Sequence, residues 1–268
     1  MKTLMAIGGA INRKNPEVLR EFVRRTGGSA ARIVILPQAS ALAKTGKDYA
    51  NLFLSLGVRS AKVLEYRRRQ EAGSKAQVQM LREASGIFIT GGNQMRLSAL
   101  FGGTALEKEL QDAYQRGCLI GGTSAGAAIL SKVMIAYGKD GPTPRERIVQ
   151  LAPGLGFTDK FVFDMHFRQR DRLGRLIYSV ATNPGILGIG VDEDTAAIIE
   201  DDVSVWACGS GGITIVDGSQ ISSSDVAEIE KGGPVAVSVL NLHVLTKDCC
   251  YNRETRAALI PEKVLLTE

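Results

Sequence analysis

Short apolar runs alternate with amphipathic stretches along this chain up to about residue 200. Five runs have the length and composition of strands: TLMAIG (3–8), RIVILP (32–37), AKVLEY (61–66), GIFIT (86–90) and CLIGG (118–122). The stretches between them have helical periodicity. This alternation predicts an α/β fold with a mostly parallel sheet and helices on both of its faces.

Two of the predicted helices have recognisable starts. Asn15, Pro16 and Glu17 combine a capping side chain, a proline at the first helical position and an early acid. Thr104, followed three residues later by Glu107, has the spacing of a capping box. Both signals place a helix between two of the predicted strands.

The pattern changes after about residue 185. GILGIGV, TAAIIE, VSVWAC, ITIVDG and VAVSVLNLHVL all have strand character, with Gly, Asp and Ser turns between them. This part of the chain is predicted to form antiparallel strands that extend the sheet. Residues 1–268 are therefore expected to form a single domain.

Composition limits the possible partners. The formal net charge of +5 suits an anionic substrate or a nucleic acid. The densest basic run, 67–69, has no interleaved aromatic residues, so a solvated loop is expected there and no nucleic-acid partner. No apolar segment approaches the roughly 18 residues of a membrane span, and the N-terminal apolar run is too short for an export signal. A cytoplasmic protein without membrane contact is expected.

The two histidines and four cysteines do not form the spacing of a metal site. No C-x-x-C pair is present, and Cys249 and Cys250 are adjacent, which prevents a bridge between them. Free structural thiols are expected, with no metal.

The strongest signal for chemistry is the sequence GTSAG at 122–126, a G-x-S-x-G between an apolar strand and a helical run. This context is the one that a nucleophile elbow requires, and it predicts Ser124 as a nucleophile. The start of the following helix offers free N–H groups to a developing oxyanion. A phosphate-binding turn or close packing is the alternative.

A second glycine-rich loop, TGGNQ at 90–94, follows the strand GIFIT and should emerge at the same edge of the sheet. Gly92 and Asn93 are predicted to complete an oxyanion hole with the N–H of Ala125. An ordinary strand-to-helix turn would have the same sequence.

A serine nucleophile needs a base, and the chain has two histidines. His166 lies where an apolar run meets an Arg-rich helical pattern, whereas His243 lies inside a strand, where most histidines are structural. The third member should be a carboxylate that fixes the imidazole tautomer. Asp192, Glu193 and Asp194 are three such acids in a row, and the residues alone do not choose between them.

Arginines follow His166 at once. Arg168, Arg172 and Arg175 have the spacing of one helical face. This set of arginines, with Arg170, is predicted to bind carboxylates, because guanidinium groups match carboxylates bidentately. Arg170, Arg172 and Arg175 are the predicted clamp residues for the substrate. A charged face in contact with solvent is the alternative.

Four blocks together resemble the cyanophycinases, in the serine peptidase family that also contains dipeptidase E. They are GGNQMRL (91–97), GGTSAGAAILS (121–131), DMHFRQRDRLGRL (164–176) and GIGVDEDTA (188–196), in matching order and spacing. The resemblance implies a class I amidotransferase-like fold, a homodimer and no cofactor. It also implies a triad of Ser124, His166 and Glu193. Substrate contacts are implied for Gln94, Asp164, Met165, Arg170, Arg172 and Arg175.

The activity that the resemblance implies is that of a serine exopeptidase. Such an enzyme cuts the polyaspartate backbone of cyanophycin and releases β-Asp-Arg dipeptides through an acyl-enzyme on Ser124. A related Asp-directed dipeptidase or an isoaspartyl-peptide hydrolase is the alternative.

Three other classes are disfavoured by the sequence. An esterase would use the order Ser, acid, His and would need His243, and a glutaminase would need a cysteine in place of Ser124. A basic polyanion-binding protein would explain the arginines alone.

Three positions depart from the family. Cyanophycinases usually have glutamine at the place of Met165 and aspartate at the place of Asn93, and GGAIN (8–12) lacks an expected acid. Met165 should leave a softer, more apolar wall. Restoring glutamine at 165 is then expected to speed cleavage. The alternative is that residue 165 points into the core behind the site, where glutamine would bury an amide without a partner and lower stability.

Overall fold

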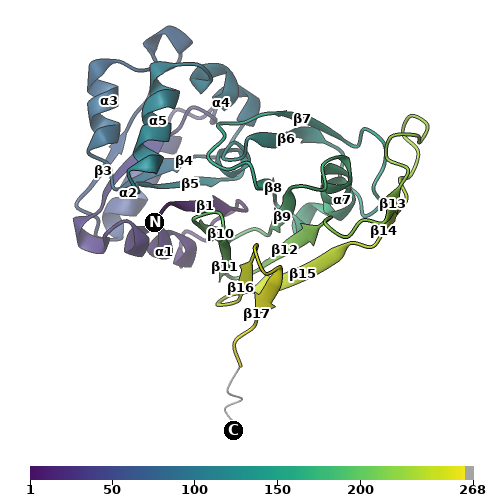
Figure 1. Cartoon of the computed structure of the whole chain (residues 1–268). Coiled ribbons are helices and arrows are strands. Elements are labelled where there is room, and N and C mark those ends of the chain that lie inside the picture. The colour runs from purple at the N-terminus through teal and green to yellow at the C-terminus, as the bar shows by residue number, and fades with distance from the viewer. Residues whose placement is uncertain (263–268) are drawn as a thin grey trace.

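The main sheet runs through the centre of the molecule in the computed structural model, which describes residues 1–262. Its strands lie in the order β17-β16-β11-β10-β1-β5-β4-β2-β3 (Figure 1). In chain order they are β1 (Thr3–Ile7), β2 (Arg32–Leu36), β3 (Ser60–Val63), β4 (Gly86–Ile89), β5 (Leu119–Thr123), β10 (Thr195–Glu200), β11 (Ser204–Gly209), β16 (Cys250–Asn252) and β17 (Ala257–Leu259).

The first five of these strands are parallel. β1 pairs with β5, β5 with β4, and β2 with both β4 and β3, in parallel register. β10, β11, β16 and β17 then extend the sheet beyond β1 in antiparallel register. The predicted α/β fold with a parallel sheet and an antiparallel C-terminal extension is confirmed.

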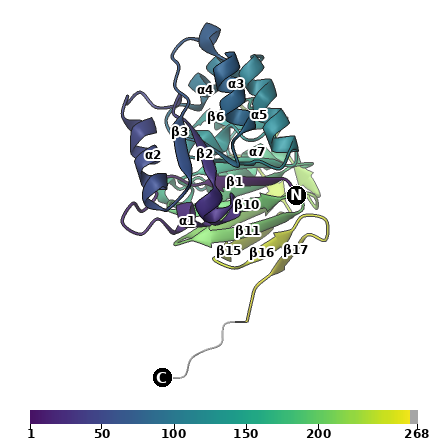
Figure 2. The same cartoon turned by 90° about the vertical axis from the view of Figure 1, so that its left-hand side faces the viewer.

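Helices cover both faces of the parallel strands. α1 (Glu17–Arg25) and α2 (Thr45–Ser55) lie on one face, and α3 (Lys75–Arg82), α4 (Gln94–Phe101) and α5 (Ala105–Gln115) lie on the other (Figure 2). The buried side chains of the two groups of helices belong to two different core clusters. Strands covered on both faces carry near-continuous apolar runs. This burial explains why the five runs have so few polar residues.

The two predicted helix starts differ in outcome. The Thr104 hydroxyl accepts the N–H of Glu107 at 3.3 Å, as a cap should. The N-terminus of α1 has no side-chain cap, because the Asn15 side chain accepts a hydrogen bond from Arg20 instead. The prediction of an Asn15 cap was therefore wrong.

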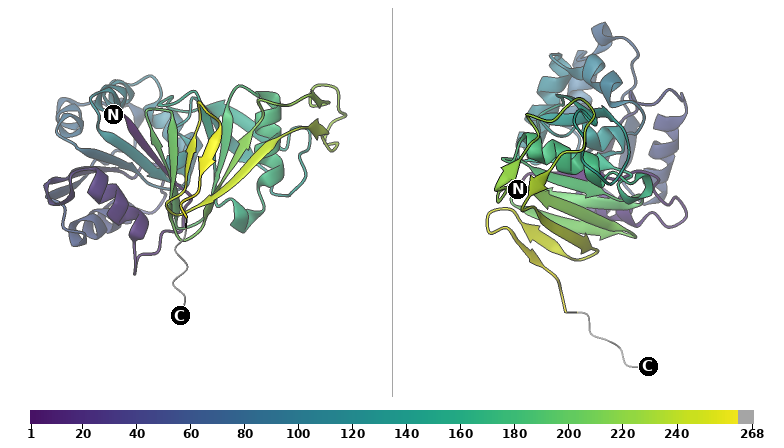
Figure 3. Two further views of the ribbon diagram at one scale, coloured as in Figure 1. Left: turned by 60° about the horizontal axis from the view of Figure 1, so that its bottom comes forward. Right: turned by 90° about the vertical axis from the view of Figure 1, so that its right-hand side faces the viewer.

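A second sheet has the order β15-β12-β9-β8, and this sheet was not expected. It consists of β8 (Phe161–Met165), β9 (Leu187–Val191), β12 (Gly212–Asp217) and β15 (Asn241–Thr246). β8 and β9 are parallel and are joined through α7 (Leu173–Thr182), so they form a βαβ unit. Three strand-like segments of the C-terminal region therefore pair here and not in the main sheet (Figure 3).

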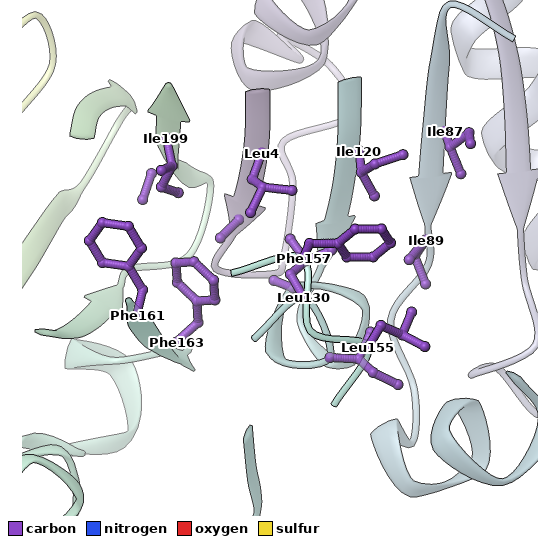
Figure 4. Close-up of a cluster of buried hydrophobic side chains, with 14 of the residues drawn as sticks. Leu4, Ile87, Ile89, Ile120, Leu130, Leu155, Phe157, Phe161, Phe163 and Ile199 are labelled. Atoms are coloured by element: carbon purple, nitrogen blue, oxygen red, sulfur yellow. The ribbon is translucent and has the colours of Figure 1, made fainter. Parts of the chain in front are cut away.

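One buried cluster joins the two sheets. Leu4 and Ile120 of the main sheet belong to the same cluster as Phe161 and Phe163 of β8, and each is at most 2% exposed (Figure 4). A core shared in this way holds the second sheet at a fixed position against the first.

The remaining elements are short. They are η1 (Gly28–Ala30), η2 (Arg69–Glu71), α6 (Ala125–Ala128), η3 (Arg168–Arg170), the hairpin of β6 (Val133–Gly138) and β7 (Val149–Pro153), and the pair β13 (Ser223–Ser224) and β14 (Val237–Ser238). Within residues 1–262, no helix has the length and apolar character needed to cross a membrane.

Candidate active site

Ser124 stands at a sharp turn between β5 and α6. Its backbone, with φ of 52° and ψ of −115°, has a conformation that L-residues rarely adopt and that costs about 1–3 kcal/mol. Both flanking glycines are required by space. A Cβ on Gly122 would lie 2.1 Å from the carbonyl oxygen of Gly126, and one on Gly126 would lie 2.2 Å from that of Ile89. The G-x-S-x-G pattern therefore reflects close backbone packing around the serine.

His166 follows β8 and reaches Ser124 from the second sheet. Its Nε2 lies 3.0 Å from the Ser124 Oγ, and its Nδ1 lies 2.7 Å from Oε1 of Glu193. An ionised carboxylate only accepts hydrogen bonds, so Nδ1 carries the proton of the neutral ring. Nε2 is then free to accept the serine proton.

The neighbours of Glu193 bond elsewhere. Asp192 accepts the backbone N–H groups of Arg168 and Gly212. Asp194 accepts the backbone N–H of Asn12 at 2.9 Å. Of the three adjacent acids, only Glu193 contacts His166, so the choice that the residues left open is made by the tertiary structure.

Three consecutive carbonyl groups at the end of β1 and in the turn that follows it anchor the three loops that carry these side chains. The carbonyl of Ile7 accepts the N–H of Ser124 at 2.9 Å, and that of Gly8 accepts the N–H of His166 at 2.9 Å. The carbonyl of Gly9 accepts the N–H of Asp194, next to Glu193, at 2.8 Å. The segment 7–9 therefore fixes the three loops relative to one another.

Sequence reasoning missed the role of this segment, although the pair of glycines directly after a strand was a signal. A Cβ on Gly8 would lie 1.9 Å from the Asp192 carbonyl oxygen, and one on Gly9 would lie 2.2 Å from Cε1 of His166. Gly9 also has a φ of 104°. Only glycine allows the imidazole to lie against this backbone.

A pocket of about 270 Å³ opens at Ser124 and His166. Its wall comes from the loops after β4 and β5, from β6, and from the segment 163–175. Among the predicted residues, Gly92, Gln94, Ala125, Asp164, Met165, Arg170, Arg172 and Arg175 all line it.

The loop after β4 passes directly beside the serine. A Cβ on Gly91 would lie 3.2 Å from the Ser124 Cβ. In the described part of the chain, no acceptor is bonded to the N–H groups of Gly92 and Ala125. These two donors remain available for an oxyanion.

Asn93 does not fit the predicted oxyanion hole. Its N–H donates to the Ala39 carbonyl at 3.0 Å, and its side chain caps α4 by accepting the N–H groups of Met95 and Arg96. Its backbone donor is already used, so this prediction was wrong. Asparagine still caps a helix well, which explains how the position tolerates it.

Asp164 and Arg175 form a buried, bidentate ion pair. The Asp164 Oδ2 accepts Nε of Arg175 at 2.6 Å, and a second bond joins their other atoms. Arg172 bonds to Asp140 at 2.9 Å and to the Met165 carbonyl at 2.5 Å. Both guanidinium groups are thus paired within the protein.

Arg170 is the exception among the three predicted clamp residues. It is exposed, and the described residues include no carboxylate paired with it. The predicted single face of Arg168, Arg172 and Arg175 is wrong, because Asp171 with φ of 49° separates η3 from α7.

Gln94, Met165 and His243 also make contacts within the protein. Gln94 donates from its amide to carbonyls of β6. Met165 is 4% exposed and packs in the main core cluster. His243 lies in β15, inside a strand as predicted, and its ring is 4.9 Å from that of Tyr251 in β16. Within residues 1–262, no group of acidic, His and Cys side chains has the geometry of a metal site.

An α/β sheet that presents a hydrogen-bonded Ser–His–Glu chain beside two free N–H donors has the arrangement of a serine hydrolase. Residues 4–205 match peptidase family S51. This chain belongs to that family and is a serine-type peptidase.

Relatives agree with the family. The chain is 38% identical to the cyanophycinase of Synechococcus elongatus over 255 residues, which cover 94% of this chain and 79% of the relative. It is 36% identical to the cyanophycinase of Geminocystis herdmanii over 256 residues, which cover 94% of each chain. The resemblance stated from the four blocks is confirmed.

Solved structures agree in fold. A peptidase from an acI-B1 Actinobacterium matches with a TM-score of 0.68 at 19% identity, over 94% of this chain and 97% of that one. A putative peptidase E protein from Listeria monocytogenes matches with a TM-score of 0.56 at 18% identity, over 79% of this chain and 100% of that one.

Proposed function

We propose that this chain hydrolyses the polyaspartate backbone of cyanophycin and releases β-Asp-Arg dipeptides. The relatives named cyanophycinase match nearly the whole chain. The single observation that carries the proposal is the continuous chain of hydrogen bonds from Ser124 through His166 to Glu193. This chain lies at a pocket whose wall includes Arg170, a cation with no carboxylate partner among residues 1–262.

The geometry accounts for each chemical step. His166 Nε2 accepts the proton of Ser124 as its Oγ attacks the scissile carbonyl. Glu193 holds the Nδ1 proton and stabilises the imidazolium that forms. The N–H groups of Gly92 and Ala125 are proposed to bind the oxyanion of the tetrahedral intermediate. The His166 imidazolium donates its proton to the amine as the C–N bond breaks, which leaves an acyl-enzyme on Ser124. His166 then accepts a proton from the water that attacks the acyl-enzyme and returns it to the Ser124 Oγ as the acid product leaves.

The substrate suits the charge of the pocket. In cyanophycin each aspartate side chain is amide-linked to an arginine, so every unit has one free carboxylate and one guanidinium. Arg170 is proposed to bind a carboxylate of the unit that is released, through charge-assisted hydrogen bonds. Arg172, Arg175 and Asp164 are proposed to shape the pocket around it.

The test is incubation of the purified protein with cyanophycin and with a panel of α- and β-aspartyl dipeptides, followed by mass spectrometry. β-Asp-Arg should appear from cyanophycin. Products from the dipeptides alone would instead indicate an Asp-directed dipeptidase or an isoaspartyl-peptide hydrolase.

Ser124→Ala should lower turnover by about three orders of magnitude or more and leave the fold intact, because it removes the nucleophile and leaves only oxyanion and binding effects. Circular dichroism checks the fold of the variant. Near-full activity of the variant would show that Ser124 is not the nucleophile.

We also propose that the enzyme is a homodimer, as the resemblance implies, and that it acts in the cytoplasm. The edge strand β15 exposes Leu242 (50%) and Val244 (61%), which is an unusual surface for a monomer. Light scattering of the purified protein tests the dimer, and cell fractionation tests the location. A monomer at micromolar concentration would contradict the first proposal.

A further inference from the structure

Tyr137 is an exposed aromatic residue at the wall of the active-site pocket. It lies in β6, and 53% of it is accessible to solvent. In the described part of the chain its hydroxyl has no hydrogen-bond partner. A large aromatic side chain exposed at a pocket that holds the nucleophile provides a contact surface for a substrate.

The backbone of β6 is built to present this ring. Ile135 pairs with Leu151 and Tyr137 with Gln150, so Ala136 is an extra residue in β6. Such a bulge changes the direction of the following side chain, and bulges are frequent beside active sites. The Gln94 side-chain amide bonds to the carbonyls of Ile135 at 3.2 Å and Ala136 at 2.5 Å, which fixes the bulge from the loop beside the nucleophile.

The charges of the pocket wall define which charged groups of a substrate can bind there. Arg172 and Arg175 are balanced by Asp140 and Asp164, so Arg170 alone among the wall arginines remains unpaired in the described residues. One carboxylate of the substrate can pair with Arg170. A guanidinium of the same unit is repelled by Arg170 and needs a partner elsewhere on the wall, and aromatic faces attract guanidinium groups.

We propose that Tyr137 is a specificity-determining residue that binds the arginine guanidinium of the substrate on its ring face. This inference rests on the proposed function, because it assigns the cation of the cyanophycin unit to a residue of the same pocket. Gln94 is then a positioning residue, which acts through the bulge.

The test compares short β-Asp-Arg oligomers with matched oligomers in which citrulline replaces arginine. Citrulline keeps the size of the side chain and removes its charge. The measured quantity is the ratio of kcat/KM for the arginine and citrulline substrates. Tyr137→Leu should lower this ratio about two- to thirtyfold, the range of a cation–π contact. Tyr137→Phe, which keeps the ring, should keep most of the ratio.

A Tyr137→Leu variant with an unchanged ratio overturns the proposal, whether its activity is high or low. Equal losses in the leucine and phenylalanine variants also overturn it, because the hydroxyl would then be the contact. The same substitutions in a Ser124→Ala background, with affinities for both oligomers measured by calorimetry, test the binding without turnover. Failure of the wild type to hydrolyse cyanophycin contradicts the proposed function, and the calorimetric ratio still decides the role of Tyr137.

Discussion

The arginines around His166 differ in their surroundings, and this difference can be measured residue by residue. Arg170 is exposed and unpaired in the described residues, whereas Arg175 is 5% exposed and bound to the buried Asp164. Arg170→Met should leave stability unchanged and lower kcat/KM on cyanophycin about ten- to a hundredfold, because a charge-assisted bond to substrate is lost. Steady-state kinetics measures this effect.

Arg175→Met serves as the contrasting variant. It leaves the Asp164 carboxylate buried without a partner, which should cost about 3–5 kcal/mol of unfolding free energy. Urea denaturation measures that loss. Equal stability of the two variants would mean that Arg175 is free to bind substrate, as the sequence predicted.

Met165 is a second residue whose role the structure changes. Because its side chain is 4% exposed within the core cluster, a glutamine there would bury an amide without a partner. Met165→Gln should therefore lose about 1–3 kcal/mol of stability and gain no activity. The melting temperature and the cyanophycin turnover of this variant show whether residue 165 is part of the core or contacts the substrate. A faster variant of unchanged stability would restore the expectation drawn from the family.

At the scale of elements, the turn after β1 is the decisive connection. Gly9→Ala should push the His166 ring away from Ser124, because the new Cβ would lie 2.2 Å from Cε1. A displacement of about 1 Å can cost a hundredfold in rate, and a fall in kcat of at least this size is expected. Steady-state kinetics measures the fall.

Gly27→Ala is the matched control. Gly27 has a similar φ of 111°, yet a Cβ there would approach nothing closer than 3.8 Å. The Gly27→Ala variant should lose stability through backbone strain, and its kcat should stay unchanged. Equal kcat values for the two variants would show that the turn does not position the histidine.

At the scale of the whole molecule, Asp217 joins the two sheets. It lies in β12 of the second sheet, and its carboxylate accepts bonds from Tyr251 of β16 and from Arg256. Burial alone would raise its pKa, but the bonds from Arg256 and from the N–H of Ser219 outweigh burial and hold the pKa below its ordinary value.

A carboxylate with a depressed folded pKa stabilises the fold above its unfolded pKa of about 4, and this contribution is lost as the pH falls through the lower folded value. The wild type should therefore melt well above Asp217→Asn at pH 7, and the difference should shrink at about pH 3. Thermal melts at the two pH values measure this. A constant difference would show that the charge of Asp217 does not hold the sheets together.

The sequence by itself determined the parts of this protein that depend on neighbouring residues. Apolar runs and helical periodicity located the strands and helices of the parallel sheet, because each pattern is set within about ten residues. The elbow at Ser124 was equally local, since the strand, the G-x-S-x-G turn and the helix start follow one another along the chain. Four blocks in order then identified the family.

Only the tertiary structure decided what depends on residues far apart in the chain. It selected Glu193 over two adjacent acids, because the carbonyls of the turn at 7–9 fix the loops. It divided the C-terminal strands between two sheets, since β9 pairs with β8 through a βαβ unit. It also paired Arg175 with Asp164, while Arg170 has no carboxylate partner among residues 1–262. Strand pairing and the burial of charged groups depend on which surfaces come into contact in the folded core. These contacts join residues far apart in the chain, so local sequence patterns do not predict them.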